Sequence, residues 1–291
     1  MKKVVVTGGA GFIGSNLVDK LIEGGIEVTI LDNLSTGKKE NINPKAKFIK
    51  CDVAVDNPMF VGVDTIFHLA AKTAVQESIE NPKLYNDVNV RGTLNMLEMA
   101  KKYGIKRFVF SSSSSVYGDT TTPTKESNPI NPISPYALNK VIGEQYCKLY
   151  STLYNIDTVC LRYFNVYGNR MNNEGGYKSV LPIFKENTLN NKTLTINNDG
   201  NQKRDFINVL DICEANIACG AHKGEFGGEI YNVGQGKNHT INEVADMFGG
   251  KKEYGNRVIE PFESLADVSK ITKKLKWRPK RKLKTWIHTY I

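Results

Sequence analysis

Two patterns of apolar residues alternate along the first half of the chain. Short runs rich in Val, Ile and Phe are typical of strands. Longer stretches lie between them, with apolar residues three or four positions apart, as on one face of a helix. We expect strands at 3–7, 27–31, 47–50, 65–69, 107–110 and 157–161, and helices from the first glycine turn to residue 24, from about 82 to 103 and from 134 to about 154. Repeated β–α units of this kind build a parallel, doubly wound α/β sheet.

The pattern changes after about Asn165, where segments become shorter, less regular and richer in Asn and Gly. A helix near 209–219 and a strand at 229–233 resume the earlier alternation. We therefore predict two domains. The first covers residues 1–165, with 205–235 returning to it, and the second is a smaller α/β region at 166–291.

The positive charge of the chain is concentrated near its C-terminus. Nine basic residues and no acidic residue lie between Lys270 and Lys284, and the rest of the chain has thirty charges of each sign. A basic stretch can bind nucleic acid or an anionic membrane. This stretch also carries apolar residues suited to packing on the body of the protein, so we expect neither partner. Those residues are Leu275, Trp277, Leu283, Trp286 and Ile287.

The five cysteines are odd in number, widely scattered and never spaced as Cys-x-x-Cys. This spacing makes a disulfide framework and a metal site both unfavourable and fits a reducing cytoplasm. A glycine turn interrupts the first apolar run after three valines, so we expect no secretion signal. The longest apolar runs are too short for a transmembrane helix.

A glycine-rich turn at residues 7–14 joins the first strand to the first helix. Its glycines suit a tight turn, a close backbone approach to a pyrophosphate and close packing of helix on strand. The helix N-terminus favours the phosphates. Asp32 ends the second strand, where a carboxylate accepts hydrogen bonds from an adenosine ribose and repels a 2′-phosphate. Asn33 follows where an NADP site would need a basic residue. The sequence therefore predicts a Rossmann-type domain that binds NAD.

Tyr136 and Lys140 are four residues apart in the helix that Ser134 and a proline open, so they share one helix face. An ammonium group and a cationic nicotinamide both lower the pKa of a phenol from its usual value of about 10. Such a tyrosine can exchange a proton near neutral pH. The serine run 111–115 follows the fifth strand, where α/β sheets bind ligands, and we expect it to form a loop that offers a hydroxyl to the tyrosine.

With these motifs, the chain resembles the extended short-chain dehydrogenase/reductase family, and within it the nucleotide-sugar 4-epimerases of the UDP-glucose and UDP-N-acetylglucosamine type. The resemblance covers essentially the whole chain. The segments that carry it are 7–14, 32–33, 52–53, 68–71, 89–93, 111–118, 134–140, 161–168, 204–206, 231–234 and 264–267.

The resemblance implies a role for each matching residue. Ser113, Tyr136 and Lys140 would be catalytic, with Tyr136 as the general base and Lys140 also binding the nicotinamide ribose. The cofactor NAD would be bound by Gly8, Gly11, Phe12, Ile13, Gly14, Asp32, Asn33, Ser35, Thr36, Gly37, Asp52, Val53, Leu69, Ala70, Ala71, Lys72, Asn89, Ser111, Tyr136, Lys140, Tyr163, Phe164 and Val166. The UDP-sugar would be bound by Thr73, Ser113, Asn165, Ser179, Arg204, Arg257 and Ser264.

The implied reaction is oxidation and re-reduction at one carbon. Related 4,6-dehydratases carry Asp-Glu after the catalytic residue and related decarboxylases keep a glutamate nearby, whereas this chain has Ser114 and Ser115. Tyr136 would remove the proton of the sugar 4-hydroxyl while C4 gives a hydride to NAD⁺, and both would return after the 4-keto sugar turns over.

Ser264 lies where the family uses side-chain size to select the sugar. A small residue resembles enzymes that admit a 2-acetamido group, which favours interconversion of UDP-GlcNAc and UDP-GalNAc and leaves room for UDP-glucose and UDP-galactose. By resemblance, the helices that start at Pro82 and Ser134 would form a homodimer interface.

Two other functions stay open at this point. One is a nucleotide-sugar dehydrogenase or reductase of the same family that exchanges NAD(H) with solvent. The other is a non-catalytic, NAD-binding regulatory protein.

Overall fold

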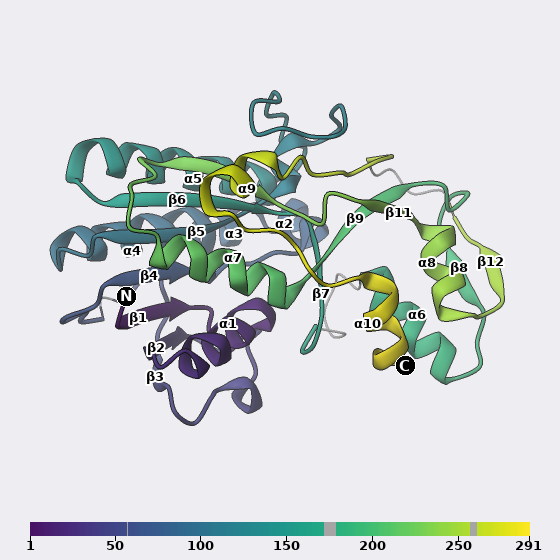
Figure 1. Ribbon diagram of the computed structural model, residues 1–291, viewed down its shortest axis with the longest axis horizontal. Helices are drawn as coiled ribbons and strands as arrows, with labels where there is room; N and C mark the ends of the chain where they lie inside the picture. Colours follow the sequence, from purple (N-terminus) through teal and green to yellow (C-terminus); the bar gives the residue numbers. More distant parts are fainter. Residues whose placement is uncertain (57, 172–178, 257–260) are drawn as a thin grey trace.

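The computed structural model describes residues 1–56, 58–171, 179–256 and 261–291. Its central element is a seven-stranded sheet in the order β10-β6-β5-β4-β1-β2-β3 (Figure 1), in which every neighbouring pair is parallel. The predicted parallel, doubly wound α/β fold is confirmed. The strands are β1 (Lys3–Thr7), β2 (Glu27–Asp32), β3 (Lys47–Lys50), β4 (Thr65–His68), β5 (Arg107–Ser113), β6 (Asp157–Tyr163) and β10 (Glu229–Val233).

The strand order reverses between β1 and β4. From β1 the chain moves outward to β2 and β3, and it then crosses back to β4 and continues outward to β5, β6 and β10. The connections that follow β1 and β4 therefore run to opposite sides of the sheet. Their divergence opens a crevice at the carboxyl ends of these two strands.

Helices cover both faces of the sheet, and a separate apolar cluster fills each interface. On one face, α1 (Phe12–Glu23) and α7 (Val209–Ala221) pack on the strands (Figure 1). On the other face lie α4 (Gly92–Lys102) and α5 (Pro135–Tyr154). The strands are buried on both sides, which explains why they read as continuous apolar runs rather than as alternating ones.

The helix predicted at 82–103 is confirmed over 82–102, but it contains a wider turn that was not predicted. It consists of α3 (Pro82–Asn86), a turn of π-helix, η2 (Asp87–Arg91), and then α4; a short α2 (Val75–Glu80) precedes it. The wider turn contains Asn89, whose side chain donates to the carbonyl of Lys72 at 2.9 Å and accepts from its N–H at 2.8 Å. The local sequence pattern does not reveal these bonds to a distant segment. For this reason the periodicity predicted an ordinary α-helix.

The serine run 111–115 does not form the predicted loop. β5 continues through Ser113, and a 3₁₀ turn, η3 (Ser114–Tyr117), follows it. Ser112 donates to the carboxylate of Glu144 at 2.5 Å, and Ser111 shares a hydrogen bond of 3.0 Å with Tyr163. These buried partners satisfy the serine hydroxyls, and the strand therefore extends through polar residues.

The chain after β6 builds smaller sheets beside the central one (Figure 1), with their own apolar cluster. The cluster includes Tyr167, Phe184, Phe206 and Phe248. The predicted domain boundary at 165 stays a prediction. The elements are β7 (Asn165–Tyr167), β9 (Lys203–Asn208) and β11 (Asn238–Thr240) in one sheet, β8 (Leu194–Ile196) and β12 (Lys252–Tyr254) in another, and the helices α6 (Val180–Leu189), α8 (Ile241–Phe248) and α10 (Leu283–Tyr290). The helix α9 (Ser269–Leu275) packs on β10 of the central sheet instead, and a 3₁₀ turn η1 (Lys39–Asn41) lies earlier in the chain.

The basic C-terminal segment is packed on the body of the protein. Trp277, Leu283 and Ile287 are buried, and Leu275 and Trp286 are partly buried against the apolar clusters. The expectation that these residues are anchors is confirmed. None of the helices in the described parts of the chain is long and apolar enough to cross a membrane.

A buried ion pair ties α5 to β6 beside the serine strand. Arg162 donates to both carboxylate oxygens of Glu144, at 2.8 and 2.7 Å, and both side chains are almost fully buried. The guanidinium also lies 4.6 Å from the ring centroid of Tyr117. Because the pair also receives the Ser112 hydroxyl, it fixes the end of β5 where Ser113 emerges.

We predict that replacing Glu144 with Gln lowers the free energy of unfolding by about 3–5 kcal/mol, because the buried guanidinium of Arg162 loses its counter-charge. Chemical denaturation measures this loss. Glu23→Gln removes the exposed ion pair with Lys20 and should cost less than about 1 kcal/mol. Equal losses for the two variants would contradict the role given to the buried pair.

Candidate active site

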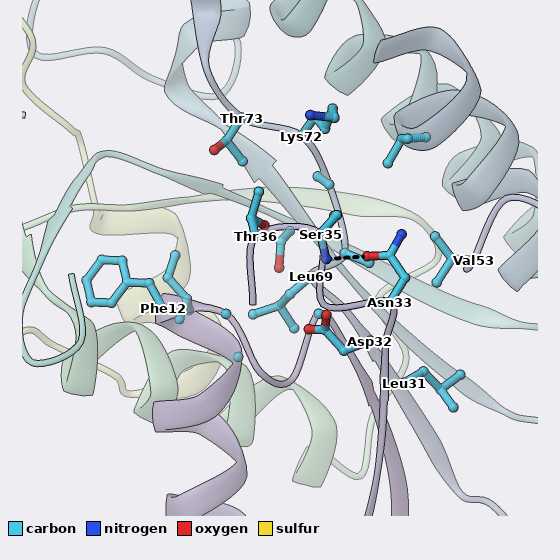
Figure 2. A pocket seen from close by; sticks show the side chains of 18 of the residues that line it. Phe12, Leu31, Asp32, Asn33, Ser35, Thr36, Val53, Leu69, Lys72 and Thr73 are labelled. Atoms are coloured by element: carbon cyan, nitrogen blue, oxygen red, sulfur yellow. Dashed lines mark hydrogen bonds between the residues drawn. The ribbon is translucent and has the colours of Figure 1, made fainter. Parts of the chain in front are cut away.

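A cavity of about 640 Å³ lies at the carboxyl ends of β1, β2, β4, β5 and β6. Figure 2 shows Asp32 and Asn33 at the end of β2, together with Leu69, Lys72 and Thr73 from the segment after β4. The lining of the cavity includes most of the residues predicted for the cofactor, and one predicted for the substrate. These are Gly8, Gly11, Phe12, Ile13, Gly14, Asp32, Asn33, Ser35, Thr36, Asp52, Val53, Leu69, Ala70, Ala71, Lys72, Thr73, Ser111, Tyr136, Lys140 and Tyr163.

The glycine turn forms the floor of the cavity between β1 and α1. Gly8 has a φ of +69°, and a Cβ there would lie 2.8 Å from the backbone nitrogen of Ala70. A Cβ on Gly14 would lie only 2.1 Å from the carbonyl oxygen of Gly8. Among the described residues no side chain caps the start of α1 at Gly11, so its N–H groups face the cavity. This cradle fits a dinucleotide pyrophosphate.

Asp32 is placed at the end of β2, inside the cavity wall. One of its oxygens accepts from the N–H of Ala10 at 3.0 Å and the other from the N–H of Leu34 at 2.8 Å. A Cβ on Gly37 would lie 2.9 Å from the carboxylate, so this glycine lets the chain pass close to it. The carboxylate is therefore fixed by backbone and keeps lone pairs for a ribose.

The neighbouring wall is built by Asn33 and Asp52. The Asn33 amide donates to Asp52 at 3.3 Å and accepts from the N–H of Ser35 at 3.0 Å (Figure 2). Asp52 also accepts from the N–H of Ala54 at 2.9 Å. The two side chains hold the ends of β2 and β3 together.

A chain of buried hydrogen bonds holds the opposite wall. Thr7 accepts from the N–H groups of Leu69 and Ala70 at 3.1 Å each, so its hydroxyl proton points to Nδ1 of His68, 2.8 Å away. Nε2 of His68 then donates to Thr93, at 3.0 Å. Burial lowers the pKa of His68 to about 3, and the charge of Lys140 adds to this, so the ring stays neutral. His68 therefore has a structural position between β1 and α4.

Tyr136 and Lys140 extend from the first turns of α5 into the cavity. Lys140 donates to the carbonyl of Ser111 at 2.7 Å, and its ammonium lies 5.8 Å from the ring centroid of Tyr136. Burial lowers the pKa of Lys140 to about 8. Burial raises the pKa of Tyr136, and a hydrogen bond with Ser113 opposes that rise. The predicted serine, tyrosine and lysine are therefore brought together.

Three of the predicted substrate residues, Asn165, Arg204 and Ser264, lie beside Asp205. Asn165 donates to Ser264 and to the carbonyl of Asp205, both at 3.0 Å. Asp205 accepts from three backbone N–H groups, which join β9 to the segments at 235–236 and 266. Burial nevertheless raises its pKa to about 6. Arg204 donates to the carbonyl of Lys203 at 2.9 Å.

Some predicted residues support the cavity without lining it. Phe164 is buried with Val116 and Tyr117, and Val166 packs on the core beneath the sheet. The predicted site residues that do not line the cavity are Gly37, Asn89, Ser113, Phe164, Asn165, Val166, Ser179, Arg204 and Ser264. Arg257 lies outside the described residues.

The structure also adds lining residues that the motifs did not predict. They include Lys38, Ala74, Glu77, Ser112, Arg170 and Met171. The carboxylate of Glu77 accepts from the ammonium of Lys72 and from the hydroxyl of Tyr85, both at 2.9 Å, and its place four residues beyond Thr73 was a usable signal. Among the described residues, no group of three or more His, Cys, Asp or Glu side chains is arranged to hold a metal ion.

The fold and this cavity define a dinucleotide-binding α/β protein with a serine, tyrosine and lysine site. The sequence matches the NAD dependent epimerase/dehydratase family over residues 4–234. The chain belongs to this family, and NAD is its cofactor.

Individual relatives are similar over nearly the whole chain. A Methanocaldococcus jannaschii protein with the provisional name UDP-glucose 4-epimerase is 44% identical over 98% of this chain and 95% of its own. The solved UDP-N-acetylglucosamine 4-epimerase of Methanobrevibacter ruminantium, in complex with UDP-N-acetylmuramic acid, is 38% identical, with a TM-score of 0.93 over 98% of this chain and 96% of that chain. UDP-glucuronic acid decarboxylase 1 of Arabidopsis thaliana is 36% identical over 97% of this chain and 67% of its own.

We predict that Gly14→Ala weakens NAD binding at least about tenfold, since the new methyl group must displace the Gly8 carbonyl that shapes the pyrophosphate cradle. Titration of the NAD-free protein with NAD measures the affinity. Gly24→Ala, at the other end of α1, places its Cβ 3.4 Å from the nearest atom and serves as the control. An unchanged affinity for a folded Gly14→Ala variant would contradict the role of the turn.

Proposed function

We propose that this protein is an NAD-dependent nucleotide-sugar 4-epimerase that interconverts UDP-GlcNAc and UDP-GalNAc, with room for UDP-glucose and UDP-galactose. The observation that carries the proposal is the meeting of Ser113, Tyr136 and Lys140 at the sheet edge where the dinucleotide cavity ends. The similar M. jannaschii and M. ruminantium proteins are both named as UDP-sugar 4-epimerases, which supports the same reaction class.

Three parts of the cavity bind different groups of NAD in this proposal. The N-terminus of α1 holds the pyrophosphate, and Asp32 accepts the adenosine ribose hydroxyls. Lys140 binds the nicotinamide ribose. When bound, NAD supplies the hydride acceptor and donor, and the protein contributes orientation and charge.

Tyr136 handles the proton of the sugar 4-hydroxyl. Burial alone keeps its phenol protonated, so its pKa must fall for it to act as a base. The Lys140 ammonium and the positive nicotinamide both favour the phenolate, and the Ser113 hydroxyl orients the shared proton. The same phenol returns the proton when the 4-keto sugar presents its other face.

The residues after Ser113 favour epimerisation over the other reactions of the family. A dehydratase or a decarboxylase of this family carries a carboxylate near this point. Here Ser114 and Ser115 begin the 3₁₀ turn, and the N–H of Ser115 donates to the Ser113 hydroxyl at 3.2 Å. The aliphatic hydroxyl of a serine is too weak an acid to expel a second group from the sugar, so the chemistry stays at C4.

The sugar is selected at Ser264 in this proposal. Its hydroxyl accepts from the amide of Asn165 and, at 3.3 Å, from the N–H of Asp205, so the small side chain sits between two substrate-side strands. A small residue here leaves space for a 2-acetamido group. Thr73, Ser179, Arg204 and Arg257 would complete the UDP-sugar site, with the arginines on the diphosphate.

The protein is also proposed to act as a homodimer through the helices α3 and α5. Leu84 on α3 and Leu138, Leu149 and Leu153 on α5 are apolar side chains exposed by 43–57%. A partner helix pair would cover them.

We place the enzyme in the cytoplasm, because all five cysteines are free and buried, as a reducing compartment maintains them.

Tyr136→Phe should lower turnover by about 10²–10⁴-fold, because it removes the proton acceptor without changing the shape of the cavity. The assay is NMR of UDP-GlcNAc incubated with the protein. Binding of NAD should be kept, and Tyr154→Phe on the exposed end of α5 should keep full activity. Undiminished turnover in the Tyr136→Phe variant would contradict the proton transfer given to Tyr136, and NAD binding without turnover in the wild type would point to the non-catalytic regulatory protein.

Ser264→Tyr should reduce activity on UDP-GlcNAc at least about tenfold relative to activity on UDP-glucose, since the larger ring fills the space for the acetamido group. Comparing kcat/KM for the two substrates checks this. Ser264→Ala keeps the small size and should keep the ratio. An unchanged ratio in Ser264→Tyr would place the selection elsewhere.

Sedimentation velocity should give a dimer, and Leu153→Glu should shift it to the monomer because it buries a charge in the proposed interface. Leu189→Glu, on the exposed end of α6, should leave the dimer intact. A monomeric wild-type protein would contradict the proposed interface.

A further inference from the structure

The segment that follows β7 runs back along α1. Residues 169–171 are held there by two contacts with helix side chains. The Asn16 amide donates to the carbonyl of Asn169 at 3.0 Å, and Arg170 forms an ion pair with Asp19 at 2.7 Å. Asn16 and Asp19 are one turn apart, so they present one face of α1 to the segment.

This segment is also part of the wall of the cofactor cavity. Arg170 and Met171 line the cavity together with Gly11, Phe12 and Ile13, the residues at the start of α1 that form the pyrophosphate cradle. Residues 169–171 therefore border the cradle, with Arg170 and Met171 in the wall of the cavity, and we call these three residues the strap. Asp19 does not line the cavity and reaches the cofactor site only through Arg170.

The strap is held in an unfavourable backbone conformation. Arg170 has a φ of +65°, in the left-handed region that a residue with a Cβ rarely adopts. Such a conformation persists when the surrounding contacts fix it. Asp19 is itself fixed, since its other oxygen accepts from the Asn43 amide at 2.7 Å. The carboxylate is thus a prearranged anchor for the guanidinium.

We propose that the strap retains NAD in its cavity and that Asp19 is the positioning residue that holds the strap through Arg170. The proposal rests on the proposed function, because an epimerase must keep the reduced cofactor between its two half-reactions. To leave the cradle, the dinucleotide must displace the strap and break its two contacts with α1.

The test is the dissociation rate of NADH, measured by the loss of its fluorescence when an excess of NAD⁺ displaces it from the full-length protein. Asp19→Asn removes the ion pair and keeps an oxygen for Asn43. We expect NADH to dissociate about two- to fivefold faster, the effect of one partly exposed ion pair. The difference should shrink at high salt, which screens the wild-type pair.

Two further variants keep this test decisive. Glu23→Gln breaks the ion pair with Lys20 one turn further along α1 and should leave the dissociation rate unchanged. Asp19→Glu restores a carboxylate and should return the rate toward the wild-type value. Equal rates in Asp19→Asn and the wild type would overturn the strap proposal. Wild-type protein that binds NADH but does not epimerise any UDP-sugar would overturn the proposed function alone.

Discussion

The close contact between the first turn of α1 and the end of β1 is the constraint on which this site depends. The backbone of Gly14 lies so near the carbonyl of Gly8 that no side chain fits between them. Because the helix begins there without a side-chain cap, its N–H groups stay open toward the cavity. The strand order reverses at the same place, between β1 and β4, so the crevice and the anion site coincide.

Buried polar contacts extend this constraint to the catalytic residues. The hydrogen bonds from Thr7 through His68 to Thr93 fix the end of β4, and the Glu144–Arg162 pair fixes the end of β5. Each of these polar side chains is costly to bury, and it therefore forms hydrogen bonds with several partners. Their effect is to hold the strand ends, from which Ser113 emerges, beside the helix that carries Tyr136 and Lys140.

Local sequence patterns were sufficient to predict the central sheet, the glycine turn and the place of Asp32, whereas the other predicted cofactor residues came from the family resemblance. The apolar runs are long enough to identify buried strands, and the glycine turn and Asp32 have geometric requirements that few other structures share. The π turn at Asn89 and the extension of β5 through its serines were missed. Both are set by side chains that bond to segments far away in the chain.

Other parts of the site could not be predicted for the same reason. Arg170 carries no motif, and only the folded chain brings it to Asp19. Ser264 and Asn165 match family positions, but their mutual hydrogen bond and the organising role of Asp205 are visible only in the fold.

In the mechanism that we propose, one tightly held NAD oxidises and re-reduces the same sugar carbon. The most direct test uses UDP-GlcNAc that carries deuterium at C4, incubated with the purified protein and no added cofactor. We expect UDP-GalNAc to form and to keep the deuterium at C4. Epimerised product that has lost the deuterium, or conversion that consumes added NAD in proportion to the sugar, would contradict it.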